Sequence, residues 1–296
     1  MQDFMATEEN SMKIAVLSGK GGTGKTLLAV NLAALAQPAV YVDCDVEEPN
    51  GHLYFRPKHI VQKPVCIKIP QVNPTLCNGC RKCVEHCAFN ALAYVKDNLL
   101  IFDDICHSCG LCSLLCPQKA LSEIDKEIGI IQSGRADDVC IHTGILHIGQ
   151  ATGIPIIQNL LLEASSADAL TVIDCPPGSA CIVMESIKDA DFCLLVTEPT
   201  LFGAHNLSMV HDLVTLFNKP FGVIINKSIP GANPAETFCK ENNLPVLGKI
   251  PYDKHLSILH SNGEIAVKHS ETYRALFSSL LDAVIKEVRH ETAPHS

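Results

Sequence analysis

The chain has 296 residues, of which 47% are hydrophobic and 19% charged, with a formal net charge of −9. This length and composition allow a large buried core, whereas the acidic balance disfavours non-specific nucleic-acid binding. No apolar stretch approaches the ~20 residues that span a bilayer, so we expect neither a nucleic-acid nor a membrane partner. Residues 1–11 are polar and acidic, unlike a signal peptide, and we expect a cytoplasmic protein with a short N-terminal extension.

The first predicted unit is a strand, a glycine-rich loop and a helix. A β-branched run covers Lys13 to Leu17, and an apolar helical pattern covers Leu27 to Leu35. The intervening G-x-x-x-x-G-K-T is typical of a P-loop, whose backbone N–H groups bind phosphates at a helix N-terminus; the alternative is a plain glycine-rich turn. Lys25 would contact the β- and γ-phosphates, and the Thr26 hydroxyl would bind Mg²⁺. The predicted nucleotide-binding residues of this loop are Gly19, Lys20, Gly21, Gly22, Thr23, Gly24, Lys25 and Thr26.

A second apolar run, Ala39 to Val42, ends at Asp43-Cys44-Asp45. The run reads as a strand, and the carboxyl ends of strands are where parallel sheets bind ligands. Asp45 is therefore a candidate site residue.

Eight cysteines then follow in two similar runs. Each run reads C-x2-C-x2-C-x3-C, which is the bacterial ferredoxin pattern. In that pattern the first three cysteines bind one 4Fe-4S cluster and the fourth binds the other. The resemblance implies one cluster on Cys77, Cys80, Cys83 and Cys116, and a second on Cys87, Cys106, Cys109 and Cys112. Zinc or disulfides are the alternatives, but zinc sites usually use two separated C-x2-C pairs, and disulfides are rare inside cells.

The cysteine runs lie between two strands of the same predicted sheet, so they form an insertion. We expect residues 64–126 to make a small α+β ferredoxin domain, inserted into a P-loop domain formed by 12–63 and 127–296. About sixty residues rarely build a strong core alone, so we expect the two clusters to hold this domain together.

The rest of the chain alternates strands and helices. Ala169 to Ile173 leads into D-C-P-P-G, which is typical of Walker B, and Asp174 would hold Mg²⁺ directly or through water. Further strands are predicted at 192–196, 221–225 and 246–250. The alternation favours an α/β fold with a doubly wound, mostly parallel sheet covered on both faces.

The C-terminal segment carries apolar residues at helical spacing from Tyr273 to Val288. Acidic and basic residues are balanced on its polar face, which favours a packing helix over a membrane anchor. Other cysteines lie in or beside apolar stretches, and we expect their thiols to be buried. We also expect a buried thiol at Cys181, for which the alternative role is a ligand of a dimer-bridging cluster. These other cysteines are Cys44, Cys66, Cys175, Cys193 and Cys239.

Together these motifs resemble the MinD/ParA superfamily of P-loop ATPases, in a form that carries an inserted bacterial-type ferredoxin domain. Mrp-type iron–sulfur carriers and the nitrogenase iron protein are related to it. Lys20 gives the loop the deviant Walker A form K-G-G-T-G-K-T. In that family this lysine reaches the partner's nucleotide, so the resemblance implies an ATP-dependent homodimer.

The same resemblance implies roles for single residues. Asp45 would orient the attacking water or Mg²⁺, Asn226 would hydrogen-bond adenine, and the loop with Pro251 and Asp253 would pack near the base. The implied catalytic residues are Lys20, Lys25, Asp45 and Asp174, and the implied Mg²⁺ ligands are Thr26, Asp45 and Asp174.

Three functions are consistent with ATP, Mg²⁺ and two 4Fe-4S clusters as cofactors. In the first, an ATPase couples nucleotide state to electron transfer towards an unidentified redox partner. In the second, the protein is an ATP-dependent carrier or scaffold that delivers iron–sulfur clusters to an apo-protein. In the third, the protein is a MinD-like positioning switch whose clusters are structural. Four-thiolate ligation favours retained, redox-active clusters, so we prefer the first.

Overall fold

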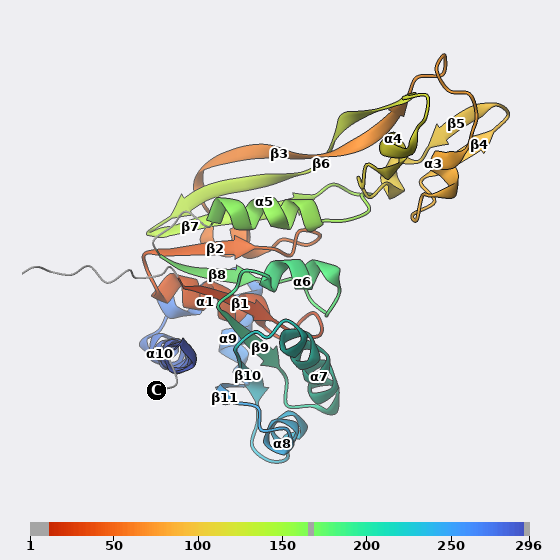
Figure 1. Ribbon diagram of the computed structural model, residues 1–296. Helices are drawn as coiled ribbons and strands as arrows, with labels where there is room; N and C mark the ends of the chain where they lie inside the picture. Colours follow the sequence, from red (N-terminus) through yellow and green to blue (C-terminus); the bar gives the residue numbers. More distant parts are fainter. Residues whose placement is uncertain (1–11, 165–168, 293–296) are drawn as a thin grey trace, which may run out of the picture.

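The computed structural model describes residues 12–164 and 169–292, so the predicted extension 1–11 lies outside the described residues. A nine-stranded sheet runs through the molecule in the order β11-β10-β9-β1-β8-β2-β7-β6-β3 (Figure 1). Its first seven strands are parallel, which confirms the predicted mostly parallel α/β sheet. These strands are β1 (Lys13–Leu17), β2 (Ala39–Asp43), β7 (Val139–Leu146), β8 (Leu170–Asp174), β9 (Phe192–Thr197), β10 (Phe221–Ser228) and β11 (Val246–Pro251).

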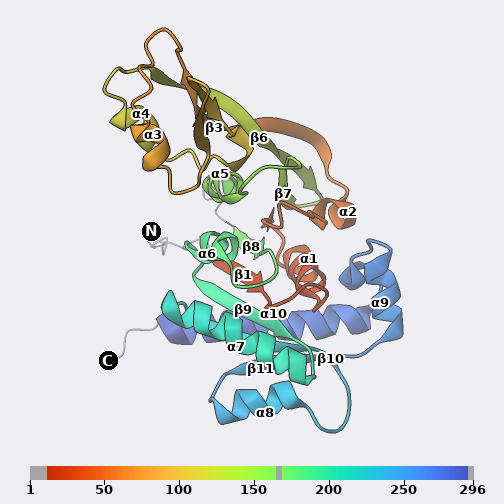
Figure 2. The ribbon, with the colours of Figure 1, turned by 90° about the vertical axis from the view of Figure 1, so that its right-hand side faces the viewer.

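Helices cover both faces of this sheet (Figure 2). Alternating side chains of β1 enter opposite cores, Ile14 and Val16 on one face and Ala15 and Leu17 on the other. The first face packs against α1, α9 and α10, and the second against α5, α6, α7 and α8. Their bounds are α1 (Lys25–Leu35), α9 (Lys254–Ser261), α10 (Glu271–Thr292), α5 (Ile154–Ala164), α6 (Cys181–Ile187), α7 (Leu201–Leu216) and α8 (Pro234–Glu241).

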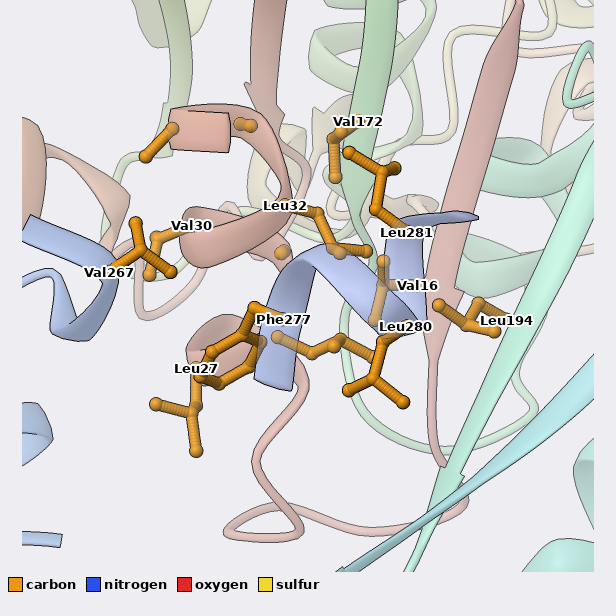
Figure 3. Close-up of a cluster of buried hydrophobic side chains, with 14 of the residues drawn as sticks. Val16, Leu27, Val30, Leu32, Val172, Leu194, Val267, Phe277, Leu280 and Leu281 are labelled. Carbon is orange, nitrogen blue, oxygen red and sulfur yellow. The ribbon is translucent and has the colours of Figure 1, made fainter. Parts of the chain in front are cut away.

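Helix α10 buries the apolar stripe that the sequence shows. Figure 3 shows Phe277, Leu280 and Leu281 turned towards side chains of α1 and of the central strands. The terminal helix therefore packs within the chain, as predicted. Among the described residues, no helix combines the length and the apolar character that crossing a membrane requires.

Two long strands extend the sheet beyond the core. β3 (Lys58–Val72) and β6 (Leu121–Ala136) pair antiparallel over almost their whole length, and β6 also pairs with β7. We call this pair of strands the arm, and residues 73–120 at its far end the head (Figure 1). The head contains the short elements α3 (Lys82–Glu85), β4 (Leu92–Val95), β5 (Asn98–Ile101), the 3-10 turn η1 (Asp103–Ile105) and α4 (Leu111–Leu115).

The arm differs from the domain boundaries that the sequence suggested. Positions 64 and 126 fall inside β3 and β6, so the head begins and ends well within the predicted insertion. The first seven residues of β3 are all exposed, and the alternation of buried and exposed residues is confined to Val65–Ile69, too short a stretch to indicate so long a strand.

The packing of α10 makes a prediction about stability. Phe277 is fully buried, so Phe277→Ala should lower the free energy of unfolding by about 3–5 kcal/mol, through lost apolar burial and the cavity left behind. Urea denaturation followed by circular dichroism measures this. Ser279→Ala, at an exposed position of the same helix, should change the stability by no more than about 0.5 kcal/mol. Equal midpoints for Phe277→Ala and the parent protein would contradict the packing role.

Candidate functional site

The loop between β1 and α1 has the backbone that a phosphate-binding loop needs. Gly22 and Gly24 have φ of 75° and 99°, a region that favours glycine. A side chain on Gly24 would overlap the Asn226 amide, which donates to the Thr23 carbonyl at 2.7 Å. Because α1 begins at Lys25, its free N–H groups and its dipole favour an anion at this point.

A cavity of about 530 Å³ opens beside this loop, at the carboxyl edge of the parallel strands. Its volume is in the range of small-molecule and cofactor sites. The structure thus brings together most of the predicted nucleotide-binding residues, whereas Gly19, Lys20, Thr23 and Asp174 do not line the cavity. The predicted residues that line it are Gly21, Gly22, Gly24, Lys25, Thr26, Asp45, Asn226, Pro251 and Asp253.

Two carboxylates lie opposite each other where β2 and β8 end. Asp43 and Asp174 are paired in the strand register, and both are buried. Burial raises the pKa of Asp174, and the Lys25 charge opposes that rise. Asp174 Oδ2 accepts a bond of 2.9 Å from the Tyr41 hydroxyl, while Oδ1 is buried without a hydrogen-bond partner. An unpaired carboxylate oxygen beside a P-loop fits the oxygen ligation that Mg²⁺ prefers.

Asp45 lies at the rim of the cavity, two residues beyond β2. Burial raises its pKa to about 6, and the Lys25 charge again opposes the rise. Glu48 and Asn50 of the same segment also line the cavity. The segment therefore adjoins whatever occupies the phosphate end of the site.

Lys20 forms an ion pair within its own chain. Its Nζ lies 2.7 Å from Glu198 Oε2, and Lys227 Nζ lies 2.7 Å from the other oxygen of Glu198. Lys227 also donates to the Gly22 carbonyl at 2.9 Å. Glu198 and Lys227 are therefore both bonded to the P-loop, Glu198 through Lys20 and Lys227 through Gly22. Burial raises the pKa of Glu198, but the bonds from the two lysines outweigh it, and the net pKa is lowered. Glu198 was not among the predicted site residues; it directly follows β9 in the sequence T-E-P-T.

The far end of the cavity contains aromatic groups that the sequence did not single out. The Tyr54 hydroxyl lies 2.9 Å from His260 Nδ1, and the two rings stack with centroids 5.2 Å apart. Both side chains line the cavity. Asp253 caps α9 and accepts a 2.7 Å bond from Tyr273. Tyr54 and His260 come from helices distant in sequence, so no local motif indicates their pairing.

The cysteines of the head border two hollows. The first is lined by Cys77, Cys80, Cys83 and Cys116, and the second by Cys87, Cys106, Cys109 and Cys112, with Cys83 between them. The fourth cysteine of each run accepts a backbone N–H bond, from Ala91 to Cys87 Sγ at 3.3 Å and from Ala120 to Cys116 Sγ at 3.2 Å. Among the described residues, no three His, Cys, Asp or Glu side chains are grouped as a site for a single metal ion.

The head repeats its backbone as well as its cysteines. Positive φ angles recur at equivalent positions of the two runs, and each run has a short helix that begins within it. The matching pairs are Gly79 and Ser108, Arg81 and Gly110, and Asn90 and Lys119. The head therefore contains two copies of one turn–helix–turn unit, and each hollow is lined by cysteines from both copies.

Six of the seven remaining cysteines divide into two groups, and the seventh, Cys140, is half-buried. Those expected to be buried are buried at positions 44, 175, 193 and 239. Cys181 and Cys66 are exposed, so the expectation of buried thiols was wrong for both. Cys181 begins α6 at the open carboxyl edge of the sheet, and Cys66 lies at an irregularity of the exposed arm.

Comparison with known families settles the relationship of this chain. The model of the CobQ/CobB/MinD/ParA nucleotide binding domain matches residues 14–267. The chain belongs to this family. It is 31% identical to the uncharacterized protein MJ0578 of Methanocaldococcus jannaschii, over 92% of this chain and 98% of that protein.

Solved structures show the same fold. The cell division ATPase MinD of Pyrococcus furiosus superposes with a TM-score of 0.59 at 18% identity, over 93% of this chain and 99% of that one. The septum site-determining protein MinD of Pyrococcus horikoshii, complexed with Mg-ADP, gives a TM-score of 0.54 at 19% identity, over 92% and 95%. The chain thus has the α/β fold of MinD/ParA-type nucleotide-binding proteins.

Lys25 offers a direct test of the nucleotide site. Lys25→Ala should weaken Mg-nucleotide binding by between about tenfold and a hundredfold, because it removes a charged donor beside the phosphates. Isothermal titration with Mg-ATP and with Mg-GTP measures the loss. Lys240→Ala, on the exposed face of α8, should bind like the parent protein. Unchanged affinity in Lys25→Ala would overturn the assignment of the loop.

Proposed function

We propose that this protein binds and hydrolyses ATP and couples its nucleotide state to electron transfer through two 4Fe-4S clusters in the head. One observation carries the proposal. The eight cysteines border two hollows in the two sets that exchanged ferredoxin ligation requires, at the end of an arm that passes the carboxyl edge of the sheet, where the nucleotide cavity lies.

The nucleotide half of the proposal follows from the cavity. Lys25 and the loop N–H groups would bind the phosphates, and Thr26, which lines the cavity, would hold Mg²⁺ together with the buried Asp174 beside it. Asp45, at the same rim, would orient the attacking water. The relative from Pyrococcus horikoshii was solved with Mg-ADP, which supports a magnesium nucleotide as ligand here.

The redox half follows from the donor set of the head. Four thiolates for each cluster are the usual ligation of a cubane, and such clusters transfer single electrons. The N–H bonds to Cys87 and Cys116 would orient these ligands and tune the cluster potential. Most of the eight thiols are at least partly exposed, so a redox partner could approach the clusters closely.

Distance decides how the two halves can communicate. β3 has 15 residues, which at ~3.3 Å per residue extends up to about 50 Å. The free part of the arm is shorter, because Val65 lies level with the carboxyl end of β7 through Gly129 and Leu146, and this part would carry the coupling between cavity and head. The arm begins at Lys58, near the amino end of β7, and passes the carboxyl edge of the sheet, where the cavity lies, before it reaches the head.

Metal content tests the clusters. Anaerobically purified protein should contain about eight irons and eight acid-labile sulfides per chain. Cys87→Ser should damage the same cluster as Cys112→Ser, as seen by electron paramagnetic resonance, since both line the second hollow. Cys66→Ser, on the arm, should keep the full iron content. Stoichiometric zinc, or loss of the first cluster in Cys87→Ser, would contradict the assignment.

Lys20 tests the proposed homodimer. Family resemblance places this lysine against a partner's nucleotide, so it would have to leave Glu198 when two chains associate. Lys20→Ala should retain Mg-ATP binding but lose ATP-dependent dimerisation in sedimentation velocity. Lys268→Ala, which removes an exposed lysine paired with Asp137, is the control. Equal dimerisation of Lys20→Ala and the parent protein would refute the role across the interface.

Redox titration tests the coupling itself. Coupling energies between sites are typically about 1–3 kcal/mol, and about 59 mV corresponds to tenfold for one electron, so potentials in Mg-ATP and Mg-ADP should differ by about 40–130 mV. Lys25→Ala should show one potential in both nucleotides. Identical potentials in the parent protein would exclude thermodynamic gating.

The MinD-like fold supports a second candidate, a nucleotide-driven positioning switch in which the clusters are structural. This function predicts ATP-dependent partner binding that survives with the clusters kept in one redox state. A third outcome, ATP-dependent loss of clusters to an apo-acceptor, would instead make the protein a cluster carrier.

A further inference from the structure

Tyr41 connects the predicted magnesium carboxylate to the root of the arm. It lies on β2, is fully buried, and donates its hydroxyl to Asp174 Oδ2 at 2.9 Å. The bond engages one oxygen of Asp174 and leaves Oδ1 without a hydrogen-bond partner. Lys25 and Thr26 also neighbour this carboxylate. The Tyr41 hydroxyl thus helps to hold the carboxylate in its orientation, together with the Thr26 hydroxyl.

The ring of Tyr41 contacts a different element, α2 (Gly51–Phe55). Its centroid lies 5.0 Å from that of Phe55, with the rings inclined at 51°. A Cβ on Gly51 would overlap the ring, so glycine is needed here for close approach. Neither the hydroxyl nor the ring can move without disturbing a partner.

Asp43 holds the same helix from the same strand. Its Oδ2 accepts backbone bonds from Asn50 at 3.0 Å and Gly51 at 2.8 Å. β2 is therefore joined to the start of α2 by a carboxylate and by an aromatic ring. Only Arg56 and Pro57 separate the end of α2 from the first residue of the arm.

We propose that Tyr41 is a positioning residue: it orients Asp174 for Mg²⁺ and joins that carboxylate to α2, so that occupancy of the magnesium site alters α2 and the start of β3. The inference rests on the proposed binding of a magnesium nucleotide and deepens it. Tyr41 does not line the cavity, so it acts through Asp174 and Gly51.

The first experiment compares Tyr41→Phe with the parent protein in Mg²⁺ and in EDTA. The variant retains the ring and loses only the hydroxyl. ADP affinity in EDTA should stay within about twofold, whereas the gain in affinity on adding Mg²⁺ should fall by roughly tenfold, the effect of losing one hydrogen bond to a charged group. A structural role alone would lower the stability and leave the magnesium gain unchanged, and that result would overturn the proposal.

Two further variants separate the contacts. Gly51→Ala keeps the hydroxyl but displaces the ring, so it should lose the magnesium gain as Tyr41→Phe does. Ser186→Ala removes another buried hydroxyl, whose bond goes to the Ile182 carbonyl on α6, and should keep the magnesium gain. An undiminished gain in Gly51→Ala would exclude the ring contact from the mechanism.

Hydrogen–deuterium exchange tests the connection to the arm. Mg-ADP should slow exchange in α2 and at the start of β3 in the parent protein, and this slowing should be lost in Tyr41→Phe at saturating nucleotide. Slowing that persists in the variant would overturn the link between Asp174 and α2. If the parent protein itself gains no affinity from Mg²⁺, the proposed magnesium nucleotide site fails, and Tyr41 is not the cause.

Discussion

The structure depends on two carboxylates buried side by side at the end of the central strands. Asp43 and Asp174 face each other across β2 and β8 in an apolar layer, where ionised groups are costly unless they are paired or hydrogen-bonded. Burial raises the pKa of both, and the charge of Asp174 raises that of Asp43 further. Each carboxylate accepts hydrogen bonds from nearby groups. Tyr41 donates to Asp174, and the backbone N–H at the start of α2 donates to Asp43.

This arrangement connects the nucleotide cavity to the chain segment that leads into the arm. The donors that satisfy Asp43 are also the residues that start α2, and α2 leads directly into β3. The P-loop brings a cation, Lys25, towards the same carboxylates. A bound cation or a lost phosphate would change the charge beside Asp174, and Asp43, Asp174 and Lys25 are the charged groups that would respond to it. The segment that leads into the arm is thus anchored at a buried carboxylate.

The sequence was sufficient wherever chemistry is local. The P-loop, the Walker B strand and the α10 stripe depend on neighbouring residues and a clear period, and the structure has each of these elements where it was predicted. The Tyr41–Asp174 bond and the Tyr54–His260 pair join residues far apart in the chain, so no spacing indicates them. The arm was missed for a different reason: only a short part of each strand is buried, and prolines and charged residues interrupt the apolar pattern. Cys181 was misjudged because exposure at a sheet edge is set by topology and not by its apolar neighbours.

The arm raises the risk of aggregation, because β3 is the edge strand of the sheet. A long unpaired strand edge is a template for pairing with another chain. β3 carries the features by which natural proteins prevent this: lysines at 58, 63 and 68, prolines at 64 and 70, and register shifts at Lys58/Val61 and Val65/Cys66. Substitutions that make this strand more regular and more apolar would strengthen its local β-propensity while promoting fibre-like association. Its irregular composition is therefore a condition for solubility.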